Sequence, residues 1–342
     1  MGRTMLNQEK QLLTPQQLKQ QYPLTAKLQQ QVQQHRNTVQ NILNGQDHRL
    51  LVIAGPCSLH DPKSALDYAQ RLQKLQQKVQ KEIFIVMRAY IEKPRTTVGW
   101  KGFLYDPNIN EQCNLEAGLQ QSRALYLQLI ELGLPLAGEI LNPMATAYLD
   151  DLLVWGAIGA RTSESQIHRE ISSSVAFPIG FKNGTDGSVQ IALDAIQSAQ
   201  AGHDFFALGQ QGLPVQKTSL GNPKPHLILR GANSGSNYDV HSIRNIQQKV
   251  KGHMPTLVID CSHGNSGKDP LKQPEILKQI IEERHLTHVR GVMLESHIED
   301  GAQKISDDMV YGKSITDGCL GWEKTQHLLE LIAATLKQKE MA

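Results

Sequence analysis

The segment LLVIAGPCSLHDPKSALDYAQRLQKLQQKVQKEIFIVMRAY, residues 50–90, contains one complete strand–helix–strand repeat. Its two ends, LLVIAGPCS and EIFIVMRAY, are short runs rich in Ile, Val and Leu, which is typical of buried strands. Between them, DPKSALDYAQRLQKLQQKV has the spacing of an amphipathic helix. This alternation of short apolar runs with helical segments predicts a fold built from β/α units.

Six further runs of the same character follow, and segments with helical patterns separate most of them. They are PLAGEI (135–140), AIGAR (157–161), FPIGFKNG (177–184), HLILRG (226–231), TLVIDCSH (256–263) and VRGVMLESH (289–297). Eight units in a chain of this length predict a (β/α)8 TIM barrel, whose typical size is about 250 residues before insertions. A doubly wound sheet is the alternative, but no Gly-rich dinucleotide fingerprint follows the first strand.

Two segments lie outside the eight units. Residues 1–50 are rich in Gln and helical in pattern, with Thr14 as a helix cap and Pro15 at the first helical position, so they predict an N-terminal helical extension. Residues 51–342 then form the catalytic barrel. The segment at about 205–225, before the sixth barrel strand, is predicted to be an inserted β-hairpin.

Composition excludes several classes of protein. The chain has 342 residues and a formal net charge of +2, with no basic run, which argues against nucleic acid as a partner. No apolar stretch approaches the roughly 18 residues of a membrane span, and the N-terminus lacks a signal-peptide core. The four cysteines are far apart and form no CxxC pair, so we expect a reduced, cytoplasmic protein.

The ends of the predicted strands carry chemically reactive or charged side chains. In chain order they are Cys57, Arg88, Glu139, Arg161, Lys182, Arg230, His263 and Glu295. In a barrel, all of these ends meet at one mouth, where TIM-barrel enzymes keep their active sites. Each residue alone has an ordinary explanation as a solvated or structural side chain, but the whole set indicates an active site.

Cations dominate this set. Lys93 and Arg95 join the strand-end cations from the loop IEKPRTTVGWKG (91–102), which Pro94 stiffens. Arginine suits bidentate contacts to phosphate or carboxylate, and lysine supplies a point charge. So many cations in a nearly neutral chain predict two phosphorylated substrates, or one substrate with a phosphate and a carboxylate and a second phosphate.

A second group combines Cys57, His263 and Glu295 with Asp317, which lies in the turn-rich stretch YGKSITDGCLGWE. This mixed set suits Mn, Fe, Co or Zn rather than Mg or Ca. The residues come from separate segments and lack zinc-finger spacing, so unrelated core residues are the alternative. Spacing alone leaves both interpretations open.

Several motifs resemble one known family. They are GPCSLHDP (55–62), EKPRTTVGWKG (92–102) and WGAIGARTSESQIHRE (155–170), followed in order by FPIGFKNGTDG, ILRG, DCSHGNS, ESH and YGKSITD. The chain resembles the metal-dependent 3-deoxy-D-arabino-heptulosonate 7-phosphate (DAHP) synthases of the class I alpha, feedback-regulated microbial type. The resemblance covers nearly the whole chain.

The resemblance implies a transferase of the shikimate pathway, in aromatic amino-acid biosynthesis. Phosphoenolpyruvate would condense with erythrose 4-phosphate and water to give DAHP and phosphate. The residues implied for phosphoenolpyruvate are Arg88, Lys93, Arg161, Lys182, Arg230 and the backbone N–H of Ala160. Arg95 and Thr96 would bind the phosphate of erythrose 4-phosphate, and Glu139 would face the substrates.

The resemblance also implies one divalent metal ion on Cys57, His263, Glu295 and Asp317, and no organic cofactor. Lys93, His263 and Asp317 are the predicted catalytic residues. We expect Lys93 to donate a proton, with a pKa lowered by nearby cations and partial burial. Glu139 or His263 would orient the attacking water.

The extension and the hairpin imply an aromatic amino-acid inhibitor, with LTPQQLKQQYPLT and DCSHGNSGKDP closer to tyrosine-sensitive members, and a homodimer or homotetramer. Three alternatives compete with this interpretation. The sister enzyme that uses arabinose 5-phosphate carries Lys-Ala-Asn-Arg in place of KPRT. A Schiff-base aldolase would use Lys182. An amino-acid sensor would have lost mouth residues, and none is lost.

Overall fold

The computed structural model describes residues 9–250 and 254–341. Eight parallel strands close into a barrel in the order β1-β10-β9-β8-β5-β4-β3-β2, which confirms the predicted TIM barrel and excludes the doubly wound sheet. The strands are β1 (Leu50–Gly55), β2 (Ile83–Arg88), β3 (Leu136–Glu139), β4 (Trp155–Ile158), β5 (Ile179–Lys182), β8 (Pro225–Leu229), β9 (Leu257–Asp260) and β10 (Val289–Glu295).

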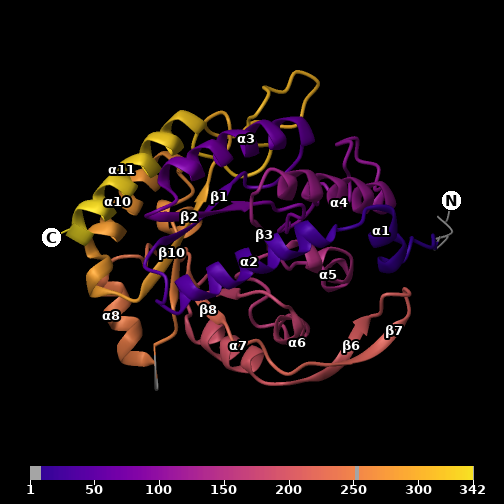
Figure 1. Cartoon of the computed structure of the whole chain (residues 1–342), viewed down its shortest axis with the longest axis horizontal. Helices are drawn as coiled ribbons and strands as arrows, with labels where there is room; N and C mark the ends of the chain where they lie inside the picture. The colour runs from indigo at the N-terminus through magenta and orange to yellow at the C-terminus, as the bar shows by residue number, and fades with distance from the viewer. Residues whose placement is uncertain (1–8, 251–253, 342) are drawn as a thin grey trace, which may run out of the picture.

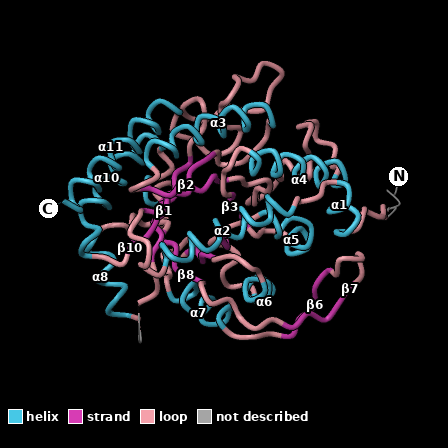
Figure 2. The backbone as a smooth tube through the Cα atoms, in the orientation of Figure 1, coloured by secondary structure: helices cyan, strands magenta, loops and turns pink. Residues whose placement is uncertain are grey.

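Helices form an outer ring around these strands (Figure 2). They are α3 (Pro62–Val79), α4 (Leu115–Glu131), α5 (Pro143–Leu149), α6 (Gln166–Ser174), α7 (Gln190–Gln200), α8 (Val240–Lys249), the short α9 (His263–Ser266), α10 (Gln273–Glu283) and α11 (Trp322–Met341). Three 3-10 turns, η1 (Asp150–Leu152), η2 (Pro270–Lys272) and η3 (Arg284–Leu286), complete the connections.

The strand–helix–strand repeat of residues 50–90 folds as its sequence predicts. All six residues of β1 are buried, because one face fills the barrel and the other packs beneath helices. The Asp61 carboxylate accepts hydrogen bonds from the backbone N–H groups of Lys63 and Ser64 and thereby caps α3. Parallel pairing of β1 with β2 aligns Leu50 with Ile83, which brings the ends of both strands to the same mouth.

The N-terminal segment contains α1 (Pro15–Gln21) and α2 (Ala26–Leu43). Thr14 and Gln17 form a reciprocal capping box at the start of α1. Helix α2 crosses the face of the barrel that is turned to the viewer in Figure 1. The Arg36 guanidinium donates to the carbonyls of Asp150 and Leu153, which lie just before β4, so α2 covers the end of the barrel opposite the mouth.

Strands β6 (Asp204–Leu208) and β7 (Pro214–Thr218) form an antiparallel hairpin between α7 and β8. The hairpin projects from the barrel towards α1 (Figure 1), and the backbone N–H of Gln16 donates to the carbonyl of Gln210 over 2.9 Å. Phe206 is 88% exposed on it. Within the described residues, no helix is long and apolar enough to cross a membrane.

One buried arginine joins the N-terminal segment to the barrel. Arg123 of α4 has no exposed surface. Its guanidinium donates to the carbonyls of Tyr22 and Tyr148, and it forms two 2.8 Å hydrogen bonds with the Asp151 carboxylate. A single side chain therefore fixes the α1–α2 connection, the end of α5 and η1 relative to one another.

We expect Arg123→Met to lower the free energy of unfolding by about 3 kcal/mol, because it leaves a partly buried carboxylate and two carbonyls without their buried donor. Urea unfolding followed by circular dichroism measures this change. The control is Arg71→Met, which breaks a half-exposed pair with Asp67 in α3 and should cost less than about 1 kcal/mol. Equal losses in both variants would contradict the role given to Arg123.

Candidate active site

A cavity of about 310 Å³ lies at the C-terminal ends of the barrel strands. It is lined by every residue that the sequence predicts to contact substrate: Arg88, Lys93, Arg95, Thr96, Glu139, Ala160, Arg161, Lys182 and Arg230. His263 and Asp317 also line it. The strands end where polar residues interrupt their apolar runs. Because the strands are parallel, all of these ends lie at one mouth of the barrel. The structure brings the predicted residues together, and their individual roles stay predictions.

Carboxylates neutralise several of these cations. Two ion pairs are buried, Arg88 Nη2 with Glu295 Oε1 at 3.1 Å and Lys182 Nζ with Asp260 Oδ2 at 2.8 Å, and a third, Lys93 Nζ with Asp317 Oδ2 at 2.6 Å, is partly exposed. The sequence argument counted the cations and did not identify these carboxylate partners, which neutralise part of the positive charge. These carboxylates come from the ends of β9 and β10 and from the loop before α11.

Other cations stay available to a ligand. The Nη1 atom of Arg230 is buried and has no hydrogen-bond partner among the described residues. Arg161 Nη2 donates to Thr96 Oγ1 over 3.3 Å, which leaves its charge without a carboxylate at that contact. Arg95 and Lys268 line the same cavity. The cavity therefore retains a positive field that suits phosphate and carboxylate groups.

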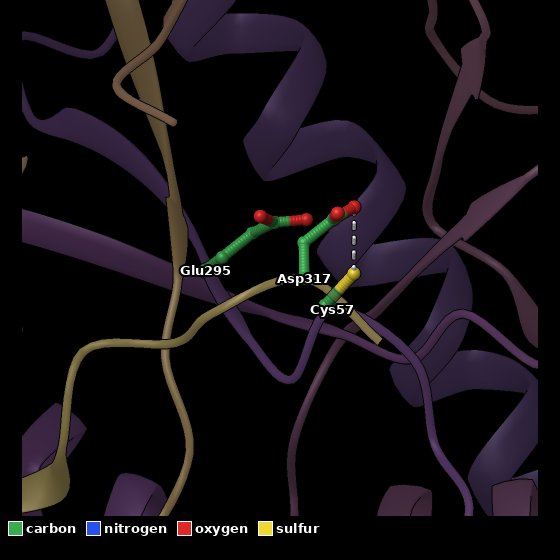
Figure 3. A group of neighbouring side chains, drawn as sticks. All are labelled: Cys57, Glu295 and Asp317. Carbon is green, nitrogen blue, oxygen red and sulfur yellow. Dashed lines mark hydrogen bonds between the residues drawn. The ribbon is translucent and has the colours of Figure 1, made fainter. Parts of the chain in front are cut away.

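Next to this cavity, Cys57, Glu295 and Asp317 offer ligand atoms that lie within 4.8 Å of one another (Figure 3). Cys57 lies two residues beyond β1, Glu295 ends β10, and Asp317 comes from the loop before α11. A thiolate with two carboxylates fits a first-row divalent ion of borderline softness. The predicted metal site thus has three of its ligands in one compact group.

His263, the fourth predicted ligand, lies beside this group. Its Nε2 atom is 3.9 Å from Glu295 Oε1, and its Nδ1 atom is 2.9 Å from Asp260 Oδ2. Its backbone φ is 52°, a left-handed conformation that is uncommon for a residue other than glycine. Such backbone strain is found preferentially at functional sites.

Protonation of the group follows from burial and neighbouring charge. Burial raises the pKa of Cys57 to about 11, and Glu295 adds to that rise. Burial also opposes ionisation of Glu295, but His263 and Arg88 outweigh it and lower the pKa. Lys93 likewise outweighs burial at Asp317 and lowers its pKa. Both carboxylates are therefore ready to bind a cation, whereas the Cys57 thiol must release a proton to do so.

The expected pKa of Lys93 is wrong in direction. Burial alone would lower it, but interaction with the acidic groups of Cys57, Glu295 and Asp317 raises the pKa above its usual value. Lys93 Nζ donates to Cys57 Sγ over 2.9 Å and to Asp317 Oδ2. The sequence argument considered neighbouring cations, whereas the fold surrounds this ammonium with anions.

Asp260 is a site residue that the sequence analysis missed. It ends β9, is almost fully buried, and its Oδ2 atom lies within 2.9 Å of both Lys182 Nζ and His263 Nδ1. It also occupies the strand-end position that drew attention to Arg88 and Glu295, so the same rule could have found it. One carboxylate oxygen thus connects a predicted substrate ligand with a predicted metal ligand.

The fold and the site together define a TIM-barrel enzyme for anionic substrates, with a cluster of metal-ligand type at its mouth. The sequence matches the DAHP synthetase I family over residues 19–330, and the chain belongs to this family.

Named relatives agree with this assignment. The Tyr-sensitive phospho-2-dehydro-3-deoxyheptonate aldolase of Escherichia coli is 43% identical, with 96% of this chain and 94% of the relative covered. The phenylalanine-inhibited enzyme of Saccharomyces cerevisiae is 44% identical, with 97% and 93% covered. A solved structure of the corresponding aldolase from Francisella tularensis has a TM-score of 0.94 and 41% identity, with 97% of this chain and 98% of that chain covered.

We expect Asp260→Asn to weaken Mn²⁺ binding to the metal-free protein by about tenfold or more, because the carboxylate that orients His263 is lost. Isothermal titration with Mn²⁺ measures the change without any assay of activity. Asp186→Asn, an exposed aspartate in the loop after β5, is the control and should bind Mn²⁺ as the unmodified protein does. Unchanged affinity in the Asp260 variant would show that His263 does not depend on this contact.

Proposed function

We propose that the protein is a transferase that condenses phosphoenolpyruvate with erythrose 4-phosphate and water to give DAHP and phosphate, the first step of the shikimate pathway. One observation carries this proposal. A single cavity contains cations suited to two phosphates and a carboxylate, directly beside a compact group of Cys57, Glu295 and Asp317. The names of the relatives support it.

Phosphoenolpyruvate carries a phosphate and a carboxylate, and we assign them to Arg161, Lys182 and Arg230, with Arg88 and the Ala160 N–H at the same wall. These side chains come from β2, β4, β5 and β8 or from the residues that follow, so the strands hold them rigidly.

Arg95 and Thr96 lie on the loop that follows β2, and we assign them to the phosphate of erythrose 4-phosphate. The contact between Arg161 and Thr96 brings the two anion positions side by side. Holding both substrates in this way supplies much of the acceleration, because it removes the entropy cost of bringing them together.

The metal ion would be held by Cys57, His263, Glu295 and Asp317, and when bound it supplies Lewis acidity towards the aldehyde oxygen of erythrose 4-phosphate. Lys93 holds a proton at Nζ beside the same group, where it can donate to an oxygen that gains negative charge. The loop that carries Lys93 continues into Arg95, so one segment positions both the proton donor and the aldose phosphate.

The reaction forms one carbon–carbon bond and releases phosphate. Carbon 3 of phosphoenolpyruvate forms a bond to the aldehyde carbon, and the aldehyde oxygen takes up a proton. Water adds to carbon 2 and gives up a proton. The bond between carbon 2 and the phosphate oxygen then breaks, the added hydroxyl becomes the carbon 2 ketone, and its remaining proton leaves with the phosphate. Glu139 and His263 both line the cavity and are the candidates for orienting this water.

Phosphate release by chelator-treated protein tests the reaction. We expect release only when phosphoenolpyruvate, erythrose 4-phosphate and Mn²⁺ are all present, because the substrates need both the cations and the metal group. Arabinose 5-phosphate is offered as the alternative aldose, and borohydride trapping tests for a Schiff base at Lys182. Phosphate release from phosphoenolpyruvate with arabinose 5-phosphate but not with erythrose 4-phosphate would refute the assignment. Trapping of a substrate adduct would refute it as well.

A second cavity, of about 440 Å³, lies between α5, α6 and the β6–β7 hairpin and is mainly apolar. Its walls include Met144, Ile171 and Phe205, and also one acidic and one basic side chain, Asp150 and Lys217. An aromatic amino acid matches this composition, with its ring among the apolar side chains, its ammonium near Asp150 and its carboxylate near Lys217. We assign this cavity to an inhibitor, and tyrosine is the first to test.

The N-terminal extension and the exposed face of the hairpin are the segments that we assign to the interface of a homodimer or homotetramer. Phe206 is largely exposed on the hairpin, and the extension contacts the hairpin turn through Gln16 and Gln210. Sedimentation equilibrium distinguishes the two assemblies.

We expect Lys217→Gln to weaken the binding of the inhibiting amino acid by about tenfold, since a charged hydrogen bond to its carboxylate is lost. Titration calorimetry with tyrosine, phenylalanine and tryptophan identifies the ligand and measures the change. The control is Lys81→Gln, an exposed lysine in the turn before β2. Wild-type binding by the Lys217 variant would place the inhibitor elsewhere.

A further inference from the structure

Glu92 precedes Lys93 and is a buried carboxylate that does not line the active-site cavity. It is 4% exposed. Its Oε2 atom accepts a hydrogen bond from the backbone N–H of Asn142 over 3.3 Å, and its Oε1 atom has no partner among the described residues. It lines a gap of about 30 Å³ beside the active site. Glu92 has no role in the proposed reaction steps.

The surroundings of Glu92 are poorly suited to a residue that only fills space. Among the ion pairs found in the described residues, none includes Glu92. Burial raises the pKa of Glu92 to about 8, the nearby Glu139 adds to the rise, and the Asn142 N–H opposes it. A buried carboxyl group without a cation lowers stability relative to an apolar side chain of similar size. Its presence next to the loop of Lys93 therefore points to a role in the site.

The gap beside Glu92 separates the two large cavities. Glu139 lines both the gap and the active-site cavity. Asn142, Thr146 and Asp150 line both the gap and the inhibitor cavity. Thr146 Oγ1 is buried and, like Glu92 Oε1, lacks a partner among the described residues. A thin partition of mainly apolar residues, which includes these buried polar groups, thus stands between the two sites.

We propose that Glu92 is a positioning residue that links the loop of Lys93 to the start of α5, and that an occupant of the inhibitor cavity reduces catalysis through this contact. The proposal deepens the proposed function and rests on it, because it concerns how that reaction is regulated.

Only a few direct contacts connect α5 with Lys93. Helix α5 has seven residues and begins directly after Asn142, whose side chain caps it by accepting from the Met144 N–H and also donates to the Tyr105 hydroxyl over 2.9 Å. A ligand that moves α5 therefore moves the Asn142 N–H. Glu92 either follows this donor or loses it, and Lys93 is the next residue along the chain.

Lys93 has little freedom to absorb such a movement. Its backbone N–H donates to the carbonyl of Lys101, and its Nζ atom is held within 2.9 Å of Cys57 Sγ and within 2.6 Å of Asp317 Oδ2. A small displacement of Glu92 therefore changes the position of the Lys93 ammonium relative to the reacting atoms. Geometric errors of about 1 Å at such a group are enough to lower rates strongly.

The test compares Glu92→Gln, which keeps an acceptor for the Asn142 N–H, with Glu92→Leu, which removes it. Tyr126→Phe is the matched control, because Tyr126 lines the same gap from α4 and donates to the Ala89 carbonyl rather than to α5. For each protein, calorimetry gives the Kd of the inhibiting amino acid. Phosphate release with and without that amino acid at saturation gives the degree of inhibition.

We expect Glu92→Leu to bind the amino acid with nearly unchanged Kd. The factor by which saturating amino acid lowers the rate of phosphate release should be about tenfold smaller than in the wild-type enzyme, a change in the range of ordinary allosteric coupling. Its kcat should fall more than its KM values change, because the loop loses its anchor. Glu92→Gln and Tyr126→Phe should retain the inhibition. Retained binding also shows that the Leu variant is folded.

Full inhibition of Glu92→Leu at saturating amino acid would overturn the proposal, and so would loss of inhibition in Tyr126→Phe to the same degree. A wild-type enzyme that releases phosphate but responds to no aromatic amino acid would also overturn it, while leaving the reaction intact. A wild-type protein that releases no phosphate would instead refute the proposed function itself.

Discussion

The mouth of the barrel depends on pairing buried or half-buried cations with nearby carboxylates. Arg88, Lys93 and Lys182 would repel one another and lose hydration if they stood alone, and each is held by a carboxylate at 2.6–3.1 Å. Two of these carboxylates, Glu295 and Asp317, belong to the group that suits a metal ion. The predicted substrate ligands and the predicted metal ligands are therefore linked in one electrostatic network, so a change in one group alters the other.

The closed barrel makes this network possible. Its members lie far apart in the sequence, and only the parallel alignment of strand ends brings them within hydrogen-bonding distance. Helix α5 borders the cavity that we assign to an inhibitor, and Asn142, the residue that caps this helix, contacts Glu92. The Arg123 guanidinium donates to the Tyr148 carbonyl near the end of this helix and holds that end in place.

The sequence was sufficient for the barrel and for the residues around its mouth. Apolar runs define the strands, and the rule that parallel strands end on one face then places Arg88, Lys182 and Glu295 together. The sequence did not identify which residues pair with these side chains. Which carboxylate meets Lys93 or Lys182 depends on strand register and on the path of the loop before α11, and no local pattern records either. The sign of the Lys93 pKa shift and the contact between Glu92 and Asn142 were missed for this reason.

Barrel closure also has a consequence for the order of events during synthesis. Strand β1 pairs with β10, where Leu51 aligns with Gly291. During synthesis, β1 therefore lacks one of its two neighbouring strands until β10 has left the ribosome. Cys57 emerges early, whereas Glu295 and Asp317 emerge late. Until then the nascent chain exposes the open edge of β1, which is prone to non-native pairing. A metal ion held by the predicted ligands Cys57, Glu295 and Asp317 would therefore bind only after β10 and the loop that follows it have been made.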